Sequence, residues 1–209
     1  MSNVIGLNEF AGLANSALTC WLCQKPASTR AIFCHHCGTV QPVRDIDHFA
    51  RLGIERRIDL DVEHLDHQYA ALSRTLDPQR FLIRGMGERT NASKQLEALK
   101  GAYEALRDPL RRGRYWLSLH HEHDAAQAEM QPMITELRAE LSTAAEPVAC
   151  DRVAQKAGQA LEDGIMGLMQ ALRGQEWEKA SSTLVHLDWL ESILGDVRTK
   201  RSDMTQASR

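Results

Sequence analysis

Four cysteines near the N-terminus are the residues whose spacing most directly suggests chemistry. Cys20 and Cys23 form one Cys-x-x-Cys pair, and Cys34 and Cys37 form a second pair after ten intervening residues. Two such pairs at this separation can place four thiolates tetrahedrally around Zn²⁺. The sequence therefore predicts a structural zinc site with these four cysteines as ligands.

A zinc ion with four protein ligands has no open coordination position, so hydrolysis at the metal is not expected. His35 and His36 lie between the last two cysteines, and either can replace one of them as a ligand. A thiol oxidoreductase using Cys20 and Cys23 is the enzymatic alternative. The sequence has no phosphate loop, dinucleotide fingerprint, nucleophile elbow or paired catalytic carboxylates. We therefore predict that the protein is not an enzyme.

The composition narrows the class of protein. The chain has 209 residues and a net charge of −3, enough length for one or two domains and no general basic footprint for nucleic acid. It has no run of 18 apolar residues, and no Lys or Arg precedes Lys25, unlike secretory and transit peptides. These features favour a cytoplasmic protein, where clustered cysteines bind metals more often than they form disulfides. The fifth cysteine, Cys150, is expected to be an inert core residue.

Helical periodicity dominates from about residue 45 onward, and these helices must position any functional residue. In the segment 61–76, apolar residues recur at spacings of three and four, so they share one helix face. Sustained two-residue alternation is absent, so little sheet is expected beyond the cysteines. The predicted helices are 45–52, 61–76, 88–107, a basic helix that begins at Asp108-Pro109, 126–145, 148–173 and 175–200.

Several motifs follow the cysteines in a fixed order along the chain. They are QP (41–42), DHFARLGIERRIDLD (47–61), LDHQYAALSRTLDPQRF (65–81), LEALKGAYEALRDPLRRGRYWL (96–117) and EWEKASSTLVHLDWLESI (176–193). This order resembles that of the HscB-type J-domain co-chaperones, including the zinc module that some members carry ahead of the J-domain. The resemblance covers residues 20–200.

Resemblance and periodicity together predict an all-α fold in four parts. They are a tail (1–17), a tetracysteine zinc module (18–43), a J-like domain containing a helical hairpin (44–120) and a C-terminal antiparallel three-helix bundle of scaffold-binding type (121–209). The family implies an adaptor in iron–sulfur cluster biogenesis, not an enzyme. Such adaptors deliver an IscU-type scaffold to a DnaK-type, HscA-like chaperone and stimulate its ATPase. Neither nucleic acid nor a membrane is expected as a partner.

The motif that stimulates the chaperone departs from the family pattern. J-domains carry His-Pro-Asp after their second helix, but alignment on the proline and on Arg80-Phe81 gives Asp77-Pro78-Gln79 here. Gln79 offers a neutral amide where the family has a carboxylate, and Asp77 is only an acceptor where the family has histidine. We therefore expect weak or absent ATPase stimulation. A J-like regulatory decoy that docks without triggering hydrolysis is the alternative.

The charge of the predicted second helix also differs from that of the family. Residues 61–76 hold Asp61, Glu63 and Asp66 against Arg74, whereas J-domains usually present a basic helix to the chaperone. Like charges on two surfaces cost affinity. The basic residues of the following loop, which runs through Arg80 to Arg89, can instead recover the positive charge.

The stretch that resembles the family's scaffold contact is MQPMITELRAEL (130–141). By this resemblance Met130, Glu136 and Arg138 are the candidate scaffold-binding residues. Pro132 and neighbouring polar residues stand where the family has apolar contacts. A nucleic-acid adaptor that uses the zinc module and the basic segment 107–114 is a further alternative, which the low net charge disfavours.

Overall fold

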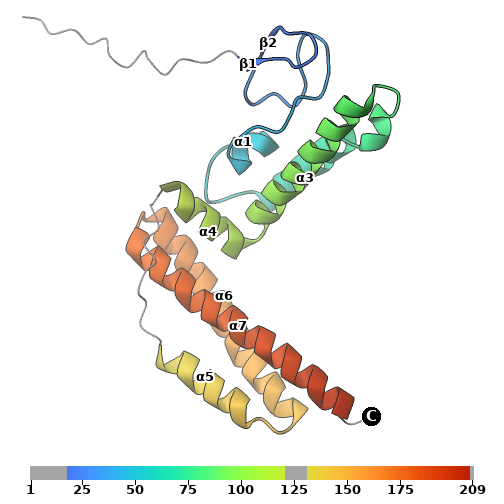
Figure 1. The fold of residues 1–209 in the computed structure, drawn as a ribbon. Helices are drawn as coiled ribbons and strands as arrows, with labels where there is room; N and C mark the ends of the chain where they lie inside the picture. The colour runs from blue at the N-terminus through green and yellow to red at the C-terminus, as the bar shows by residue number, and fades with distance from the viewer. Residues whose placement is uncertain (1–17, 121–130, 208–209) are drawn as a thin grey trace, which may run out of the picture. The chain divides into compact units, whose positions relative to one another are not determined.

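The computed structural model describes residues 18–120 and 131–207, and Figure 1 labels its elements. The described chain is predominantly helical, with one pair of short strands beside the cysteines, so the predicted all-α fold is confirmed. Among the described helices, none has the length and the hydropathy that a membrane span requires. The chain divides into two compact units, residues 18–55 with 63–103 (unit 1) and residues 56–62 with 104–207 (unit 2).

Unit 1 contains the strand pair and the first helices. Strand β1 pairs antiparallel with β2, so that Leu18 lies opposite Ala27 and Thr19 lies opposite Pro26. The elements run in the order β1 (Leu18–Thr19), β2 (Pro26–Ala27), α1 (His48–Leu52), α2 (Val62–Thr75), the 3-10 helix η1 (Pro78–Phe81) and α3 (Met86–Arg107).

Helix α1 is shorter than the predicted 45–52 because caps fix both of its ends. The Asp47 side chain accepts a hydrogen bond from Ala50 N at 2.7 Å, so the helix begins at His48. Gly53 ends it with a φ of 66°, in the left-handed region that glycine adopts without strain.

Helices α2 and α3 contact each other through an aromatic pair. The rings of Tyr69 and Tyr103 stack with 4.1 Å between centroids, and the Tyr103 hydroxyl donates a hydrogen bond to Asp66 at 2.8 Å. Both helices lie within two residues of their predicted ends. Five of the apolar residues that were predicted to share a helix face are buried: Leu65, Leu76, Ala92, Leu99 and Leu106.

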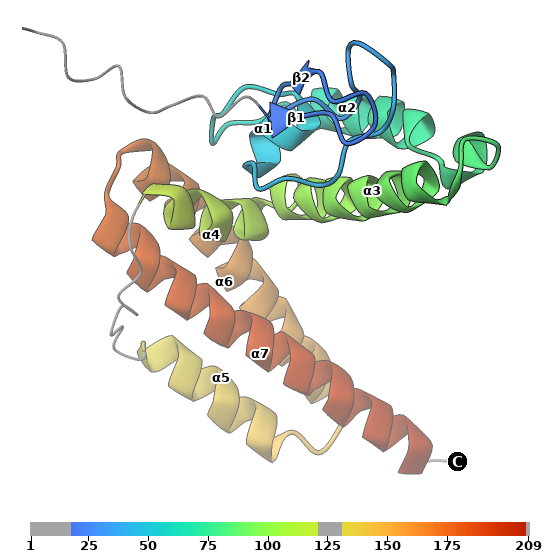
Figure 2. The same cartoon turned by 45° about the horizontal axis from the view of Figure 1, so that its top comes forward.

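Unit 2 is built on a long antiparallel helix pair, α6 and α7 (Figures 1 and 2). Helix α5 lies beside one half of this pair and α4 packs beside the other half. The predicted bundle of three helices is therefore confirmed. Helix α5 begins at Pro132 rather than 126, because proline is well placed at a first helical position. The bounds are α4 (Pro109–His120), α5 (Pro132–Thr143), α6 (Pro147–Arg173) and α7 (Trp177–Ala207).

Two glycines allow the helices of unit 2 to approach closely. A Cβ added to Gly113 on α4 would lie 2.7 Å from Leu168 Cδ2 on α6, and one added to Gly164 would lie 2.5 Å from Leu187 Cδ2 on α7. Real Cβ atoms do not come this close to a neighbouring carbon. Leu168 and Leu187 are themselves buried in a continuous apolar core. The packing of unit 2 therefore depends on small residues facing large ones.

Candidate metal centre and docking loop

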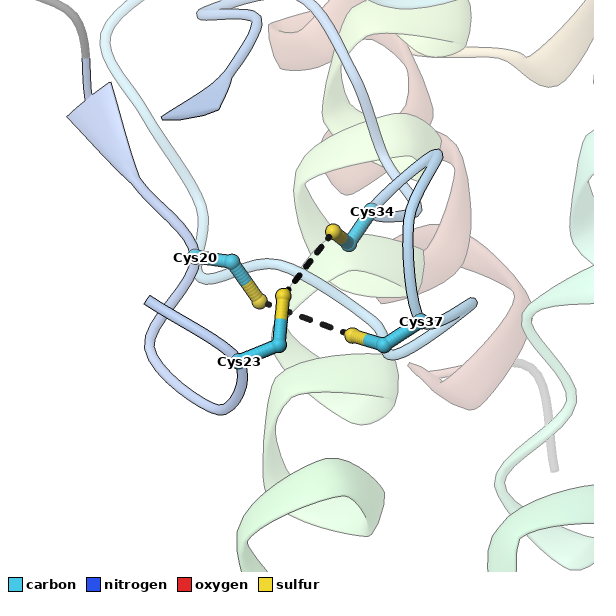
Figure 3. A group of neighbouring side chains, drawn as sticks. All are labelled: Cys20, Cys23, Cys34 and Cys37. Carbon is cyan, nitrogen blue, oxygen red and sulfur yellow. Dashed lines mark hydrogen bonds between the residues drawn. The ribbon is translucent and has the colours of Figure 1, made fainter. Parts of the chain in front are cut away.

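The four cysteines predicted as metal ligands converge on one point (Figure 3). The Sγ atoms of Cys20 and Cys37 lie 3.7 Å apart, those of Cys23 and Cys34 lie 3.8 Å apart, and all four lie within 4.8 Å of one another. Sulfurs bound tetrahedrally to Zn²⁺ at about 2.3 Å stand about 3.8 Å from one another. The arrangement can hold a metal ion, and the Cys20–Cys37 and Cys23–Cys34 separations match those expected around tetrahedral zinc.

Each Cys-x-x-Cys pair is held by a tight backbone turn. In the first turn, Gln24 N donates to Cys20 O at 3.0 Å, and in the second, Gly38 N donates to Cys34 O at 2.8 Å. Both donors have positive φ, 59° at Gln24 and 73° at Gly38, which lets the chain reverse directly after each pair. The two turns therefore direct two thiols each toward a common centre.

The four thiols differ in pKa because their surroundings differ. Burial raises the pKa of Cys20, but hydrogen bonds from the Cys23 backbone and the Gln41 side chain help to lower it to about 6. At Cys37 the Thr39 backbone N–H lowers the pKa, but burial and the neighbouring cysteines raise it further, to about 12. Because sulfurs this close repel one another when ionised, all four become thiolates only when a cation lies between them.

The alternative ligands lie outside this group. Within the described residues, the potential metal-ligand group consists of the four cysteines and includes neither His35 nor His36. The two imidazole rings instead lie against each other, with 4.0 Å between centroids. Cys150 is fully buried in the core of unit 2, as predicted.

The docking loop (residues 77–85) follows α2 and includes the 3-10 helix η1. It contains Asp77, Pro78, Gln79 and Arg80, the residues predicted from the family resemblance to dock on the chaperone. The Asp77 carboxylate accepts a hydrogen bond from Gln79 N at 2.9 Å and caps η1, in which Pro78 is the first residue. The Arg80 guanidinium also bonds within the loop region, donating to Arg74 O at 3.1 Å. The Gln79 side chain is exposed. The Asp77 side chain is therefore hydrogen-bonded to the loop backbone and the Arg80 side chain to the backbone of α2, and the exposed side chain at position 79 is neutral.

An apolar groove lies beside the docking loop, between α2 and α3. Its volume is about 610 Å³. The side chains that line it are Tyr69, Ser73, Arg74, Asp77, Pro78, Ser93, Leu96, Glu97 and Lys100. The concave surface next to the proline is therefore present although the flanking motif residues differ.

Charge on the exposed surface of unit 1 is arranged as the sequence indicates. Asp61 and Glu63 are exposed at the start of α2. Arg80, Arg84 and Arg89 are exposed in the loop and in the first turn of α3. Positive charge therefore gathers after the proline rather than along α2.

The candidate scaffold-binding residues fall on α5 or just before it. Glu136 and Arg138 are exposed on α5, whereas Ile134 and Leu137 face the core of unit 2. Met130 lies outside the described residues. The helix thus presents charged side chains outward and buries its larger aliphatic ones.

Buried polar residues between the cysteine module (residues 18–43) and α3 are not part of the sequence prediction. Gln41 is 0% exposed, and Glu88 and Gln95 are each 5% exposed. Gln95 Nε2 donates to Gln41 O at 3.0 Å, and Glu88 accepts from Val40 N at 3.2 Å. The available signal was periodicity, since Glu88 and Gln95 share the helix stripe of the buried Ala92. Polar residues at core spacing indicate buried hydrogen-bond partners.

Comparison with known proteins finds similarity to co-chaperones of the HscB type. No family model matches the chain. The mouse protein called iron–sulfur cluster co-chaperone protein HscB is 25% identical over 211 residues, which cover 96% of this chain and 90% of the mouse protein. The similarity therefore spans the cysteine module and both units.

Solved structures show the same similarity. The human co-chaperone protein HscB matches with a TM-score of 0.77 at 24% identity, covering 88% of this chain and 98% of the human one. The chaperone HscB from Vibrio cholerae matches with a TM-score of 0.64 at 26% identity, covering 76% of this chain and 99% of that one. Since sequence similarity and fold similarity agree over most of its length, the comparisons support the identification of this chain as an HscB-type J-domain co-chaperone of iron–sulfur cluster assembly.

Proposed function

We propose that this protein links an IscU-type scaffold to a DnaK-type, HscA-like chaperone, and that it stimulates the chaperone ATPase weakly or not at all. Its similarity to HscB-type co-chaperones supports the adaptor role. We also propose that the four-cysteine group, which could hold a metal ion, binds structural zinc and that the protein acts as an adaptor without catalysing a reaction, because zinc with four protein ligands has no open position. We place this activity in the cytoplasm, where reducing conditions keep the thiols available to the metal.

The prediction of weak ATPase stimulation depends on the side chains of the docking loop and their hydrogen bonds. Asp77 is the single acidic residue between residues 77 and 85, and its carboxylate is hydrogen-bonded to Gln79 N. It therefore does not replace the carboxylate that the family has at position 79. A charge-assisted hydrogen bond from a partner cation to that carboxylate contributes about 1.5–3 kcal/mol, roughly twice what a neutral amide contributes.

A single-turnover ATPase assay tests this proposal. The chaperone's hydrolysis rate is measured alone, with this protein, and with the double variant Asp77→His plus Gln79→Asp. We expect little stimulation by the natural protein and clear stimulation by the double variant, because the variant restores both motif side chains. Gln79→Asn is the matched control, since it keeps a neutral amide and should behave like the natural protein. Strong stimulation by the natural protein would contradict the proposal.

The scaffold contact is proposed at α5. Glu136 and Met133, the latter 39% exposed, line a groove of about 590 Å³ between α5 and α6. Met133 supplies apolar surface there, and Glu136 and Arg138 supply charge. Glu136→Lys and Arg138→Glu should each weaken binding of an IscU-type scaffold in calorimetric titration. The control Glu162→Lys, an exposed carboxylate on α6, should bind normally.

A regulatory decoy is the second candidate function, and the groove beside Pro78 favours it. The concave docking surface is retained while the triggering side chains have changed. A protein of this kind binds the chaperone without accelerating hydrolysis, and so competes with an active co-chaperone. Added to an assay that contains such a co-chaperone, it should lower the stimulated rate in proportion to its concentration. An unchanged rate at saturating concentration would eliminate the decoy.

A further inference from the structure

The cysteine module is fastened to the first turns of α3 by a set of buried contacts, the module–α3 interface. On the module side these contacts involve Trp21, Val40, Gln41 and Pro42, and on the helix side Gly87, Glu88, Asn91 and Gln95. Helix α3 begins at Met86, directly after the docking loop. The contacts therefore fall on the part of α3 that anchors the end of that loop.

One residue touches both a metal ligand and α3. Gln41 is fully buried, and its side-chain Nε2 donates to Cys20 Sγ at 3.3 Å. Its backbone carbonyl accepts a hydrogen bond from Gln95 Nε2 at 3.0 Å. Gln41 therefore connects a candidate metal ligand directly to α3.

A second connection runs from Val40 to the docking loop. Val40 N donates to Glu88 Oε1 at 3.2 Å, and the same carboxylate oxygen lies 3.4 Å from Arg84 Nη1. The Arg84 guanidinium lies 5.9 Å from the centre of the Phe81 ring, and Phe81 is the last residue of η1. Glu88 is therefore shared between the module and the loop.

Close packing adds to these polar contacts. The Trp21 indole donates to Val40 O at 2.8 Å, and its ring covers Gly87. A Cβ added to Gly87 would lie 3.3 Å from the Trp21 ring. By contrast, the loop just before α3 has little packing of its own, since Ile83 is 95% exposed and Met86 is 85% exposed. The loop relies on its ends for a fixed geometry.

From these contacts we propose that Gln41, Glu88 and Gln95 are positioning residues through which the metal centre holds the start of α3 and the docking loop in place. A small cysteine module requires its metal to fold. Loss of the metal therefore releases the module–α3 interface, and with it the geometry of residues 77–85. The coupling rests on the proposed function only in that these residues are taken as the docking loop.

Hydrogen–deuterium exchange of the full-length protein tests the coupling, with Zn²⁺ bound and after chelation. We expect metal removal to speed exchange in residues 86–95 about tenfold or more, and to leave α6 and α7 unchanged. Acceleration confined to residues 18–43 would overturn the proposal. No chaperone is present, so this outcome is separate from success or failure of the ATPase assay.

Two variants test separately the contact of Gln41 with α3 and its contact with Cys20. Gln95→Ala breaks the contact to α3 but not to the cysteine, so it should keep one tightly bound Zn²⁺ and still exchange rapidly at residues 86–95. Gln41→Ala removes the bond to Cys20, and should lower zinc affinity roughly 10- to 100-fold. Lys94→Ala, an exposed neighbour on α3, is the control and should change neither quantity. Unchanged exchange in Gln95→Ala would also overturn the proposal, whether or not Gln41→Ala folds.

Discussion

In unit 2, α6 and α7 pack through buried aliphatic side chains, with glycines facing leucines where the helices approach most closely. In unit 1, the cysteine module meets α3 through hydrogen bonds between polar groups that are themselves buried. Apolar packing is roughly proportional to the area removed from water and tolerates small shifts. A buried hydrogen bond is directional, and losing one partner leaves the other unsatisfied at a cost of about 1–3 kcal/mol.

Because their contacts differ, unit 2 and the cysteine module are expected to be stabilised in different ways. The core of unit 2 is large enough to fold by apolar burial, and needs no ligand to explain its stability. The cysteine module has a buried apolar cluster of only Cys20, Ala27 and Cys34 in the described chain, with Cys23 packed against it. We expect a region with so small a core to need a bound metal in order to fold, and the proposed coupling would transmit that dependence to α3 through the polar contacts.

Removing a metal ligand should give the largest effect and should affect unit 1 alone. Cys34→Ser is expected to abolish tight zinc binding and to unfold residues 18–43, because apparent binding free energies of structural zinc reach about 10–16 kcal/mol. Zinc content and NMR spectra of the variant measure this. Cys150→Ala alters the one cysteine outside the cluster, so it should keep a full equivalent of zinc. Equal zinc loss in both variants would contradict the assignment of the site.

A cavity in unit 2 should be the next largest effect, and zinc binding should not respond to it. Leu168 is fully buried, so Leu168→Ala is expected to lower the free energy of unfolding by about 2–5 kcal/mol. Urea unfolding followed by circular dichroism gives this value. Met166→Ala, two residues away but with Met166 69% exposed, should change it little. Loss of zinc from Leu168→Ala would show that the two regions are not energetically distinct.

A pair of glycine substitutions on α6 isolates the close approach of the helices. Both Gly158→Ala and Gly164→Ala gain helix propensity, but a Cβ at Gly158 meets open space and one at Gly164 meets Leu187. Gly164→Ala should therefore be the less stable variant by about 1–3 kcal/mol, the usual cost of overpacking. Urea midpoints of the two variants measure the difference directly. Equal stabilities would mean that Leu187 moves aside without cost.

Sequence reasoning reached most of the fold because apolar periodicity and the capping residues act locally. The spacing in 61–76, the Asp108-Pro109 start of α4 and the stop at Gly174 each indicate a helix boundary from nearby residues alone. The Cys-x-x-Cys spacing predicted the group of four cysteines that lie close enough to hold a metal ion for the same reason. Helix α7 continues past the predicted 200 to Ala207, the last residue that the structure describes, and no proline or glycine occurs between residues 196 and 207.

The sequence did not predict how the cysteine module attaches to α3. Gln41 and Gln95 are 54 residues apart, and nothing local to either residue indicates the other. The role of Asp77 was also hidden, because a carboxylate before a proline can face a partner or cap the next turn. Only the fold shows that it caps η1. Hydrogen bonds between polar residues that are distant in the sequence therefore could not be predicted from the pattern of residues.

The smallest expected effect concerns a surface ion pair of unit 2. Arg173 Nη2 lies 2.7 Å from Asp59 Oδ1, and its hydrogen bonds lower the pKa of the Asp59 carboxyl. A carboxyl with a lower pKa in the folded state stabilises the fold at neutral pH, and that stabilisation is lost as the pH falls through the folded-state pKa. Asp59→Asn should therefore lower the urea midpoint slightly at pH 7, less than Gly164→Ala does, and match the natural protein in strong acid. Because both side chains are about half exposed, solvent screening keeps the effect small. A larger loss at low pH than at pH 7 would contradict this role, because the Asp59 carboxyl is protonated in acid and no longer pairs with Arg173 as an anion.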